Sequence, residues 1–360
     1  WILARGSLLA RGRSMPLAQT EALDELRVLV IVDNETDTLS SVDEGLPQLS
    51  ELAHLEGRIP TSLVYEGHPG KVIIDRQCWA GHGFSALVTG RRGDEEHTVL
   101  FDAGPYPELW TANVARLGVD LARVEAVFLS HWHFDHSGAL PAAVAAVAEA
   151  RRRAGLAGPL VADLHPDRPD QRGVLLPTGT IRLLVPEPAF EAIEAAGARV
   201  ARHAEAHTLG EGFFFASGTV ERVTAYEQGL VGHLSFRDGK GQPDPLILDE
   251  RFLAAHVRGR GVSVLSACSH AGVVNACLGA RDAFGSAPLD MVLGGFHLSG
   301  RAMERRIEAT VADLQQRVRP RVVAPGHCTG WRAKAALAGA FAPGRYAPSA
   351  VGAMYVLKAE

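Results

Sequence analysis

Residues 131–136 read His-Trp-His-Phe-Asp-His, and this stretch decides how the rest of the chain is interpreted. It places three histidines and one aspartate within six residues. Imidazole and carboxylate groups are ligands that divalent transition metals prefer, whereas core packing does not account for such a concentration of polar groups. The alternative is a histidine-rich surface loop. We expect a metal site.

The cluster lies between a predicted strand and a predicted helix. The apolar run 124–130 is typical of a short buried strand, and an Ala-rich helix is expected from about 141 to 154. In an extended segment His131 and His133 point the same way and can bind one ion. Asp135 and His136 lie beyond the bend, where they can reach a second ion. The spacing therefore predicts two adjacent metals.

Three later segments repeat the pattern of an apolar run that stops at a histidine: His270, His297 and His327. Each follows a predicted strand, so we expect distant parts of the chain to converge on one sheet edge. His270 and His327 are expected to complete the two sets of metal ligands. His297 could bind metal, shuttle a proton or hold substrate, and we favour the last two roles because six candidate ligands are already available.

The HxHxDH pattern resembles the signature of the metallo-β-lactamase fold superfamily, and the resemblance covers most of the chain. It implies an α/β fold, a four-layer αββα sandwich, around one or two divalent metal ions. The segment 100–104, Leu-Phe-Asp-Ala-Gly, resembles the first motif of the superfamily. This implies that Asp102 braces the metal site without binding the ion, although an ordinary strand-ending turn residue is the alternative. His327 resembles the final metal-binding histidine.

Five short segments resemble a narrower subfamily, named for 7,8-dihydropterin-6-yl-methyl-4-(β-D-ribofuranosyl)aminobenzene 5'-phosphate synthase. They are CSHAG at 268–272, GGFHL at 294–298, GHCTG at 326–330, LVIVDN at 29–34 and HGFS at 82–85. The chain departs from the wider superfamily because no PGHT-like segment lies between the first cluster and His270. No Gly-Asp pair clearly supplies a bridging carboxylate either, so the bridging ligand and the occupancy of the second metal position stay open.

Three functions remain open at this point. One is hydrolysis of an ester, lactone or phosphodiester by metal-activated water, with Asp135 orienting the nucleophile. The second, implied by the subfamily, is transfer of a group from a phosphoribosyl-type donor, and the third is a metal-binding sensor without turnover. Arg222, in a segment similar to the subfamily's SGxxxR pattern, could bind a substrate phosphate or form a surface ion pair. Nitrogen-rich ligation favours zinc, with manganese, iron or magnesium as alternatives.

Composition bounds the remaining expectations. The chain has 360 residues, 47% of them hydrophobic, and a net charge of −5, which fits a large core and a small-molecule substrate and disfavours nucleic acid as a partner. We expect one domain over 15–360, after a non-native or disordered leader at 1–14. No run of eighteen apolar residues occurs, so no membrane partner is expected. The four cysteines show no close pairing motif, which suits a reducing cytoplasm. We expect Cys268 and Cys328 to be packing residues, and a homo-oligomer is left open.

Overall fold

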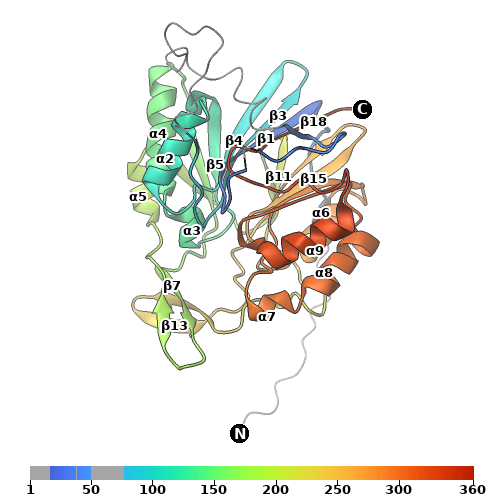
Figure 1. Ribbon diagram of the computed structural model, residues 1–360. Coiled ribbons are helices and arrows are strands. Elements are labelled where there is room, and N and C mark those ends of the chain that lie inside the picture. Colours follow the sequence, from blue (N-terminus) through green and yellow to red (C-terminus); the bar gives the residue numbers. More distant parts are fainter. Residues whose placement is uncertain (1–16, 38, 50–76) are drawn as a thin grey trace, which may run out of the picture.

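The computed structural model describes residues 17–37, 39–49 and 77–360, so the expected leader at 1–14 lies outside the described residues. Two large β-sheets pack face to face, and helices cover both outer faces (Figure 1). Apolar side chains fill three layers: one between the sheets and one beneath each set of helices. The fold is therefore the predicted four-layer αββα sandwich.

The first sheet has eight strands, and its last four strands run parallel to one another. Helices α2 (Pro107–Arg116), α4 (Leu140–Arg153) and α5 (Phe190–Ala195) cover its outer face. In spatial order the strands are β2 (Gln48–Leu49), β18 (Met354–Lys358), β1 (Glu25–Val32), β3 (Ser85–Arg92), β4 (Glu95–Phe101), β5 (Val124–Phe128), β6 (Leu160–Leu164) and β9 (Ala198–Arg202).

The second sheet has six strands, of which β15, β16 and β17 are parallel. Helices α6 (Val273–Ala283), α8 (Ile307–Asp313) and α9 (Trp331–Phe341) cover its outer face, and the short helix α7 (Arg301–Glu304) precedes α8. In spatial order the strands are β10 (His207–Leu209), β11 (Phe214–Ala216), β14 (Leu253–Val257), β15 (Gly261–Ser266), β16 (Leu289–Gly295) and β17 (Val322–Gly326).

A small third sheet projects from the sandwich, near the lower left of Figure 1. Its strands, in spatial order, are β13 (Lys240–Pro243), β12 (His233–Arg237), β7 (Gln171–Leu175) and β8 (Ile181–Leu183). His233 begins the central strand β12 and is buried. The small sheet therefore brings a histidine that the sequence analysis did not single out toward the sandwich.

The histidine-bearing strand ends lie in two sheets, which corrects the expectation of one sheet edge. The segment 131–136 follows β5 in the first sheet, whereas His270, His297 and His327 follow β15, β16 and β17 in the second. Carboxyl ends of parallel strands lie at one edge of a sheet, and the packed sheets align these edges. The metal-ligand candidates thus meet across the sandwich. Among the described residues, no helix is long and apolar enough to cross a bilayer.

Candidate metal centre

Three imidazoles form the first ligand cluster. The Nε2 atom of His131 lies 2.9 Å from Nδ1 of His133, which lies 3.0 Å from Nε2 of His270, and the two Nε2 atoms are 3.2 Å apart. All three side chains are buried, and burial lowers the pKa of each well below the ordinary value for histidine. They are therefore neutral near pH 7, the form that binds metal.

A second cluster adjoins the first and is built around the carboxylate of Asp135. Its Oδ2 atom lies 3.2 Å from Nε2 of His327 and 3.5 Å from Nε2 of His136. The rings of His131 and His136 have centroids 4.4 Å apart, so the two clusters are neighbours. Asp135 and His136 lie in the short helix α3 (Phe134–Ser137), while His327 begins the 3₁₀ turn η4 (His327–Thr329).

The electrostatics of the second cluster favour a cation. Burial would lower the pKa of His136, yet the carboxylates of Asp135 and Asp102 raise it to about 9. Burial would raise the pKa of Asp135, but His136 and His327 hold it well below the ordinary range. The Nε2 atom of His136 is buried without a hydrogen-bond partner. A proton or a metal ion is thus stabilised at this atom.

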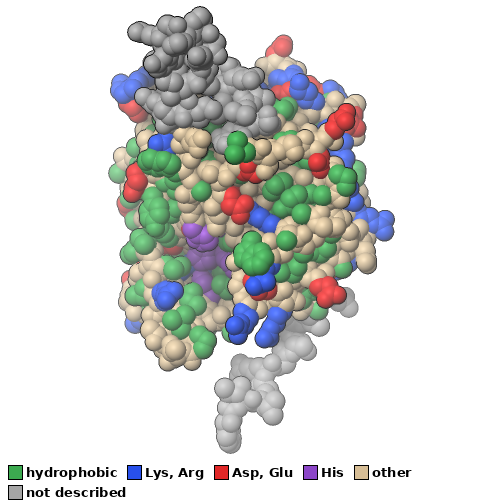
Figure 2. All heavy atoms as spheres, in the orientation of Figure 1, with side chains coloured by type: hydrophobic (Ala, Val, Ile, Leu, Met, Phe, Trp, Pro, Cys, Tyr) green, Lys and Arg blue, Asp and Glu red, His purple; other side chains and the backbone are tan. Residues whose placement is uncertain are grey.

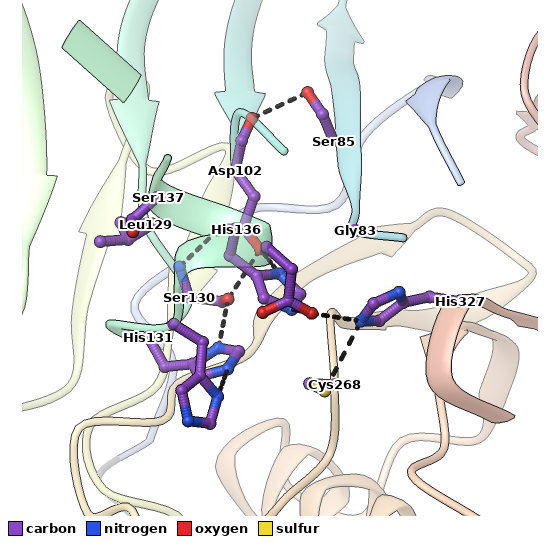
Figure 3. A network of polar contacts seen from close by, with 12 residues as sticks. Gly83, Ser85, Asp102, Leu129, Ser130, His131, His136, Ser137, Cys268 and His327 are labelled. Atoms are coloured by element: carbon purple, nitrogen blue, oxygen red, sulfur yellow. Dashed lines mark hydrogen bonds and ion pairs between the residues drawn. The ribbon is translucent and has the colours of Figure 1, made fainter. Parts of the chain in front are cut away.

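Asp102 braces this cluster from behind, as the sequence motif predicts. Its Oδ2 atom accepts hydrogen bonds from Nδ1 of His136 and Oγ of Ser130, and Oδ1 accepts one from the Ser130 backbone, each at 2.7 Å (Figure 3). Because Nδ1 of His136 donates to Asp102, Nε2 is left to face the cluster. Asp102 adopts a left-handed backbone conformation with φ of 56° as the chain leaves β4.

Three further buried carboxylates hold the ligand-bearing loops by their backbones. Glu250 accepts from the backbone of His270 at 2.7 Å and of Ala271 at 2.6 Å. Asp33 accepts from the backbone of His327 at 2.9 Å, and Asp249 accepts from that of Trp132 at 2.7 Å. The sequence analysis missed Asp249 and Glu250, because isolated acidic residues before a strand look like surface residues. Asp33 was noticed only as part of the LVIVDN segment.

Cys268 occupies the space between the two clusters. Its Sγ atom lies 3.1 Å from Sγ of Cys328, 3.5 Å from Nδ1 of His297 and 3.7 Å from Nε2 of His327. Cys268 lies in the loop after β15. It forms one potential ligand set with His131 and His136 and another with His270 and His297. The expectation that Cys268 only fills space is therefore incomplete.

The glycine pair before His297 makes room for this arrangement. A Cβ atom at Gly295 would lie 2.7 Å from Sγ of Cys328 and 3.0 Å from Cδ2 of His327. A Cβ atom at Gly294, where φ is 128°, would lie 2.0 Å from the backbone oxygen of Ser266. Larger residues at either position would push β16 away from the site.

Two histidines that the sequence analysis did not assign to the site flank the clusters. The Nε2 atom of His82 lies 3.4 Å from Oδ2 of Asp135, and its ring is 4.9 Å from that of His327. The Nε2 atom of His233 lies 2.9 Å from Nε2 of His133, and its Nδ1 contacts the backbone oxygen of Asp244 at 2.7 Å. The HGFS motif pointed to the region of His82, whereas no sequence signal marks His233.

Arg222 lies in the irregular segment after β11, with part of its side chain exposed. Its guanidinium donates to the backbone oxygen of Leu246 rather than forming the ion pair considered as an alternative. Burial lowers the pKa of Arg222. Its role toward a substrate phosphate stays a prediction.

The donor chemistry fits one or two divalent metal ions. His131, His133 and His270 form one group whose ligand atoms could hold an ion, and Asp135 and His327 form another with His82. The Nε2 atom of His136 also faces the second group, 3.5 Å from Oδ2 of Asp135. Figure 2 shows histidine side chains gathered in a hollow on one face of the molecule, so a small molecule could reach the site. The described histidine, aspartate and cysteine side chains therefore form groups that could hold divalent metal.

The family model of the metallo-beta-lactamase superfamily matches residues 79–284, more than half of the chain. The chain belongs to the metallo-β-lactamase superfamily, whose members are mostly enzymes that bind divalent metals. A curated relative from Methanocaldococcus jannaschii, 7,8-dihydropterin-6-methyl-4-(beta-D-ribofuranosyl)-aminobenzene-5'-phosphate synthase, is 27% identical over 281 residues. The matched region covers 77% of this chain and 91% of the relative. The resemblance to this subfamily, expected from the five segments, is confirmed.

One of the similar solved structures supports the fold. Tm1679, described as a metal-dependent hydrolase of the beta-lactamase superfamily, superposes with a TM-score of 0.64 at 22% identity, covering 92% of this chain and 99% of that chain. The metallo-beta-lactamase fold protein YhfI from Bacillus subtilis has a TM-score of 0.47 and 11% identity, covering 93% of this chain and 100% of that chain. The predicted sandwich of the metallo-β-lactamase type is confirmed.

Proposed function

We propose that this chain is a metal-dependent hydrolase acting on a phosphorylated or ester-type small molecule. One observation carries the proposal: two three-ligand clusters adjoin each other, with the rings of His131 and His136 only 4.4 Å apart. His131, His133 and His270 would hold one ion, and Asp135, His136 and His327 would hold the other. Zinc suits this nitrogen-rich set, and manganese, iron or magnesium are the alternatives.

Divalent ions bound here would supply Lewis acidity, lowering the pKa of water and stabilising negative charge on a substrate. The protein groups around them orient the reactants. The carboxylate of Asp135 is 21% exposed, so it can accept a hydrogen bond from an attacking water and orient it. Asp102, by fixing the ring of His136, keeps the ligand set in place before substrate arrives.

His297 is the proposed proton donor to the leaving group. Burial would lower its pKa, but Cys328 and the carboxylates of Glu250 and Asp135 raise it, so the imidazole retains a proton closer to neutral pH. Its ring centroid lies 4.3 Å from that of His270, at the margin of the first cluster. A proton donor in this place could protonate the departing oxygen.

Cys268 would supply a further ligand to these ions, since no bridging carboxylate is evident in the sequence. Its Sγ atom lies between the two clusters, and thiolates bind zinc and cobalt well. In the cobalt-substituted protein, a sulfur-to-cobalt absorption band in the near ultraviolet should be lost in Cys268→Ser. It should persist in Cys277→Ser, a control in the buried face of α6. A Cys268→Ser protein that retains the band would exclude this ligand.

Turnover of bis(p-nitrophenyl) phosphate and of simple aryl esters tests the hydrolase. The zinc-loaded chain should release nitrophenol, and His131→Ala should not, whereas His256→Ala on β14 should match the unchanged protein. A metal-loaded protein that turns over none of these esters would contradict the proposal. Tight binding of a small molecule without turnover would instead favour the sensor.

A transferase acting on a phosphoribosyl-type donor is the second candidate. It is favoured by the similarity to the synthase from Methanocaldococcus jannaschii, which extends over 91% of that relative. Release of pyrophosphate that requires both a phosphoribosyl donor and a pterin acceptor would support it. Equal release without the acceptor would indicate hydrolysis of the donor.

A further inference from the structure

A second group of histidine and aspartate side chains lies outside the two clusters described above. Its members are Asp163 near the end of β6, His203 just after β9 and His207 at the start of β10. Both imidazoles face the same carboxylate oxygen of Asp163. The Oδ2 atom of Asp163 is 2.6 Å from Nδ1 of His203 and 2.8 Å from Nε2 of His207. The two imidazole rings are 4.0 Å apart. We call these three residues the linker cluster, because His203 and His207 bound the connection between the two large sheets.

Arg251 separates the linker cluster from the metal centre. Its guanidinium donates to Oδ1 of Asp163 and to the backbone oxygen of Leu129, each at 2.7 Å. Its backbone nitrogen donates to the backbone oxygen of Ser130 at 2.9 Å. Because Oδ1 of Asp163 is bonded to Arg251, only Oδ2 faces the two imidazoles.

Both ring nitrogens of His207 face oxygen atoms. A neutral imidazole carries one N–H group. The Nδ1 atom of His207 faces the backbone oxygen of Glu205 at 3.0 Å, and its Nε2 atom faces Oδ2 of Asp163 at 2.8 Å. Both partners only accept hydrogen bonds while Asp163 is ionised. In the tautomer whose Nδ1–H group donates to Glu205, the lone pair of Nε2 is directed at Asp163, so a cation there would contact both groups.

The state of Asp163 leaves its oxygen available to a cation. The guanidinium of Arg251 donates to Oδ1 of Asp163, while Oδ2 is directed at the two imidazoles. Its side chain is fully buried, whereas that of His203 is 42% exposed. The exposed side of His203 leaves room for water to complete the coordination of an ion.

We propose that Asp163, His203 and His207 bind a divalent transition-metal ion, zinc by the nature of the donors, separate from the ions of the metal centre. Zinc–nitrogen and zinc–oxygen distances of about 2.0–2.2 Å place tetrahedral ligand atoms about 3.3 Å apart. The contact to His207 must therefore lengthen by roughly 0.5 Å and that to His203 by roughly 0.7 Å, which the exposed side chain of His203 permits. The backbone oxygen of Glu205 fixes the tautomer of His207, as carbonyls do for zinc-bound histidines.

This ion would tie β9 of the first sheet to β10 of the second. Its affinity is limited by the guanidinium of Arg251, whose positive charge lies on the other oxygen of Asp163 and opposes a further cation. We therefore expect it to be the first zinc released on dialysis, before those of the nitrogen-rich centre. We expect the bound ion to stabilise the fold, because residues 203–207 connect the two large sheets of the sandwich.

Zinc titration of the metal-free full-length protein, followed by calorimetry and elemental analysis, tests the proposal. The unchanged protein should bind one more Zn²⁺ per chain than His203→Ala or His207→Ala, and the missing ion should be the weakest. His256→Ala, a partly exposed histidine on β14, should bind the full number. The double variant of His131 and His133 should retain the weak ion, so this test does not depend on the proposed hydrolase.

His203→Gln provides a milder variant if His207→Ala fails to fold, because His203 is half exposed and its replacement still donates a hydrogen bond to Asp163. Circular dichroism checks the fold of each variant. An equal number of bound Zn²⁺ in folded His203→Gln and in the unchanged protein would overturn the proposal. So would imidazole nitrogen resonances showing that His207 stays doubly protonated at saturating Zn²⁺.

Discussion

Replacing Asp102 with asparagine should weaken metal binding by the second cluster, which contains His136. It should leave the cluster of His131, His133 and His270 unchanged. Asp102 accepts three hydrogen bonds of 2.7 Å, two from Ser130 and one from Nδ1 of His136. Asparagine keeps one oxygen for the Ser130 backbone but turns an N–H₂ group toward His136. The imidazole then has to move its proton to Nε2, the atom that should bind metal.

The expected magnitude follows from this lost contact. Removing a residue that orients a metal ligand typically lowers metal affinity by about 10- to 100-fold, or about 1.4–2.7 kcal/mol. Loss of a buried hydrogen bond to a charged group should lower the free energy of unfolding by about 2–3 kcal/mol. We therefore expect a weakened second ion in a protein that still folds.

Equilibrium dialysis against Zn²⁺ with elemental analysis, together with urea unfolding, measures both effects. Asp290→Asn is the matched control. Asp290 is a buried carboxylate near the start of β16, away from the strand end that precedes His297, and it forms ion pairs with Arg260 and Arg321. It should lose stability but no zinc affinity. If Asp102→Asn binds as much zinc as the unchanged protein at every free zinc concentration, Asp102 does not position His136 for metal.

Three other predictions test the site and its surroundings. His131→Ala and His133→Ala should each lose most of the first ion, and unchanged metal content in both by elemental analysis would remove the core of the proposed site. His297→Ala should keep its metal but lose about 100- to 10,000-fold in turnover, whereas His327→Ala should lose both; equal metal loss in the two variants would make His297 a ligand. Burial raises the pKa of Glu187 to about 7, so its protonated form stabilises the fold below pH 4.5, and this contribution is lost as pH rises through 7. Urea unfolding between pH 5 and 8 should show a fall of about 1–3 kcal/mol that Glu187→Gln reduces, and parallel profiles would assign the fall to other groups.

The sequence was sufficient to predict the fold and most of the ligand candidates. HxHxDH between a strand and a helix is a local pattern, and metal binding is the chemistry that such a spacing of ligands serves. The strands before His270, His297 and His327 also have local signals in their apolar runs. The predicted helix at 141–154 corresponds to α4, which spans Leu140–Arg153. These features depend on neighbouring residues, so sequence alone contains them.

Only the tertiary structure decided how these residues are grouped. Packing of two sheets placed His270 with His131 and His133, and His327 with Asp135, across more than 130 residues of chain. It also moved Cys268 from an expected packing role to the space between the clusters. No local pattern contains this information, because it depends on the register of strands in two different sheets.

The supporting residues were the hardest to predict. Glu250, Asp249 and His233 have no periodicity or motif, and each acts through a partner distant in sequence. The linker cluster is of the same kind: Asp163 and His207 are ordinary polar residues until two sheets bring them within 2.8 Å. The sequence by itself predicted the fold, through its resemblance to a known superfamily, and it supplied the candidate metal ligands, because motifs and residue types are local. The tertiary structure alone decided which candidate ligands lie together, because that depends on contacts between distant strands.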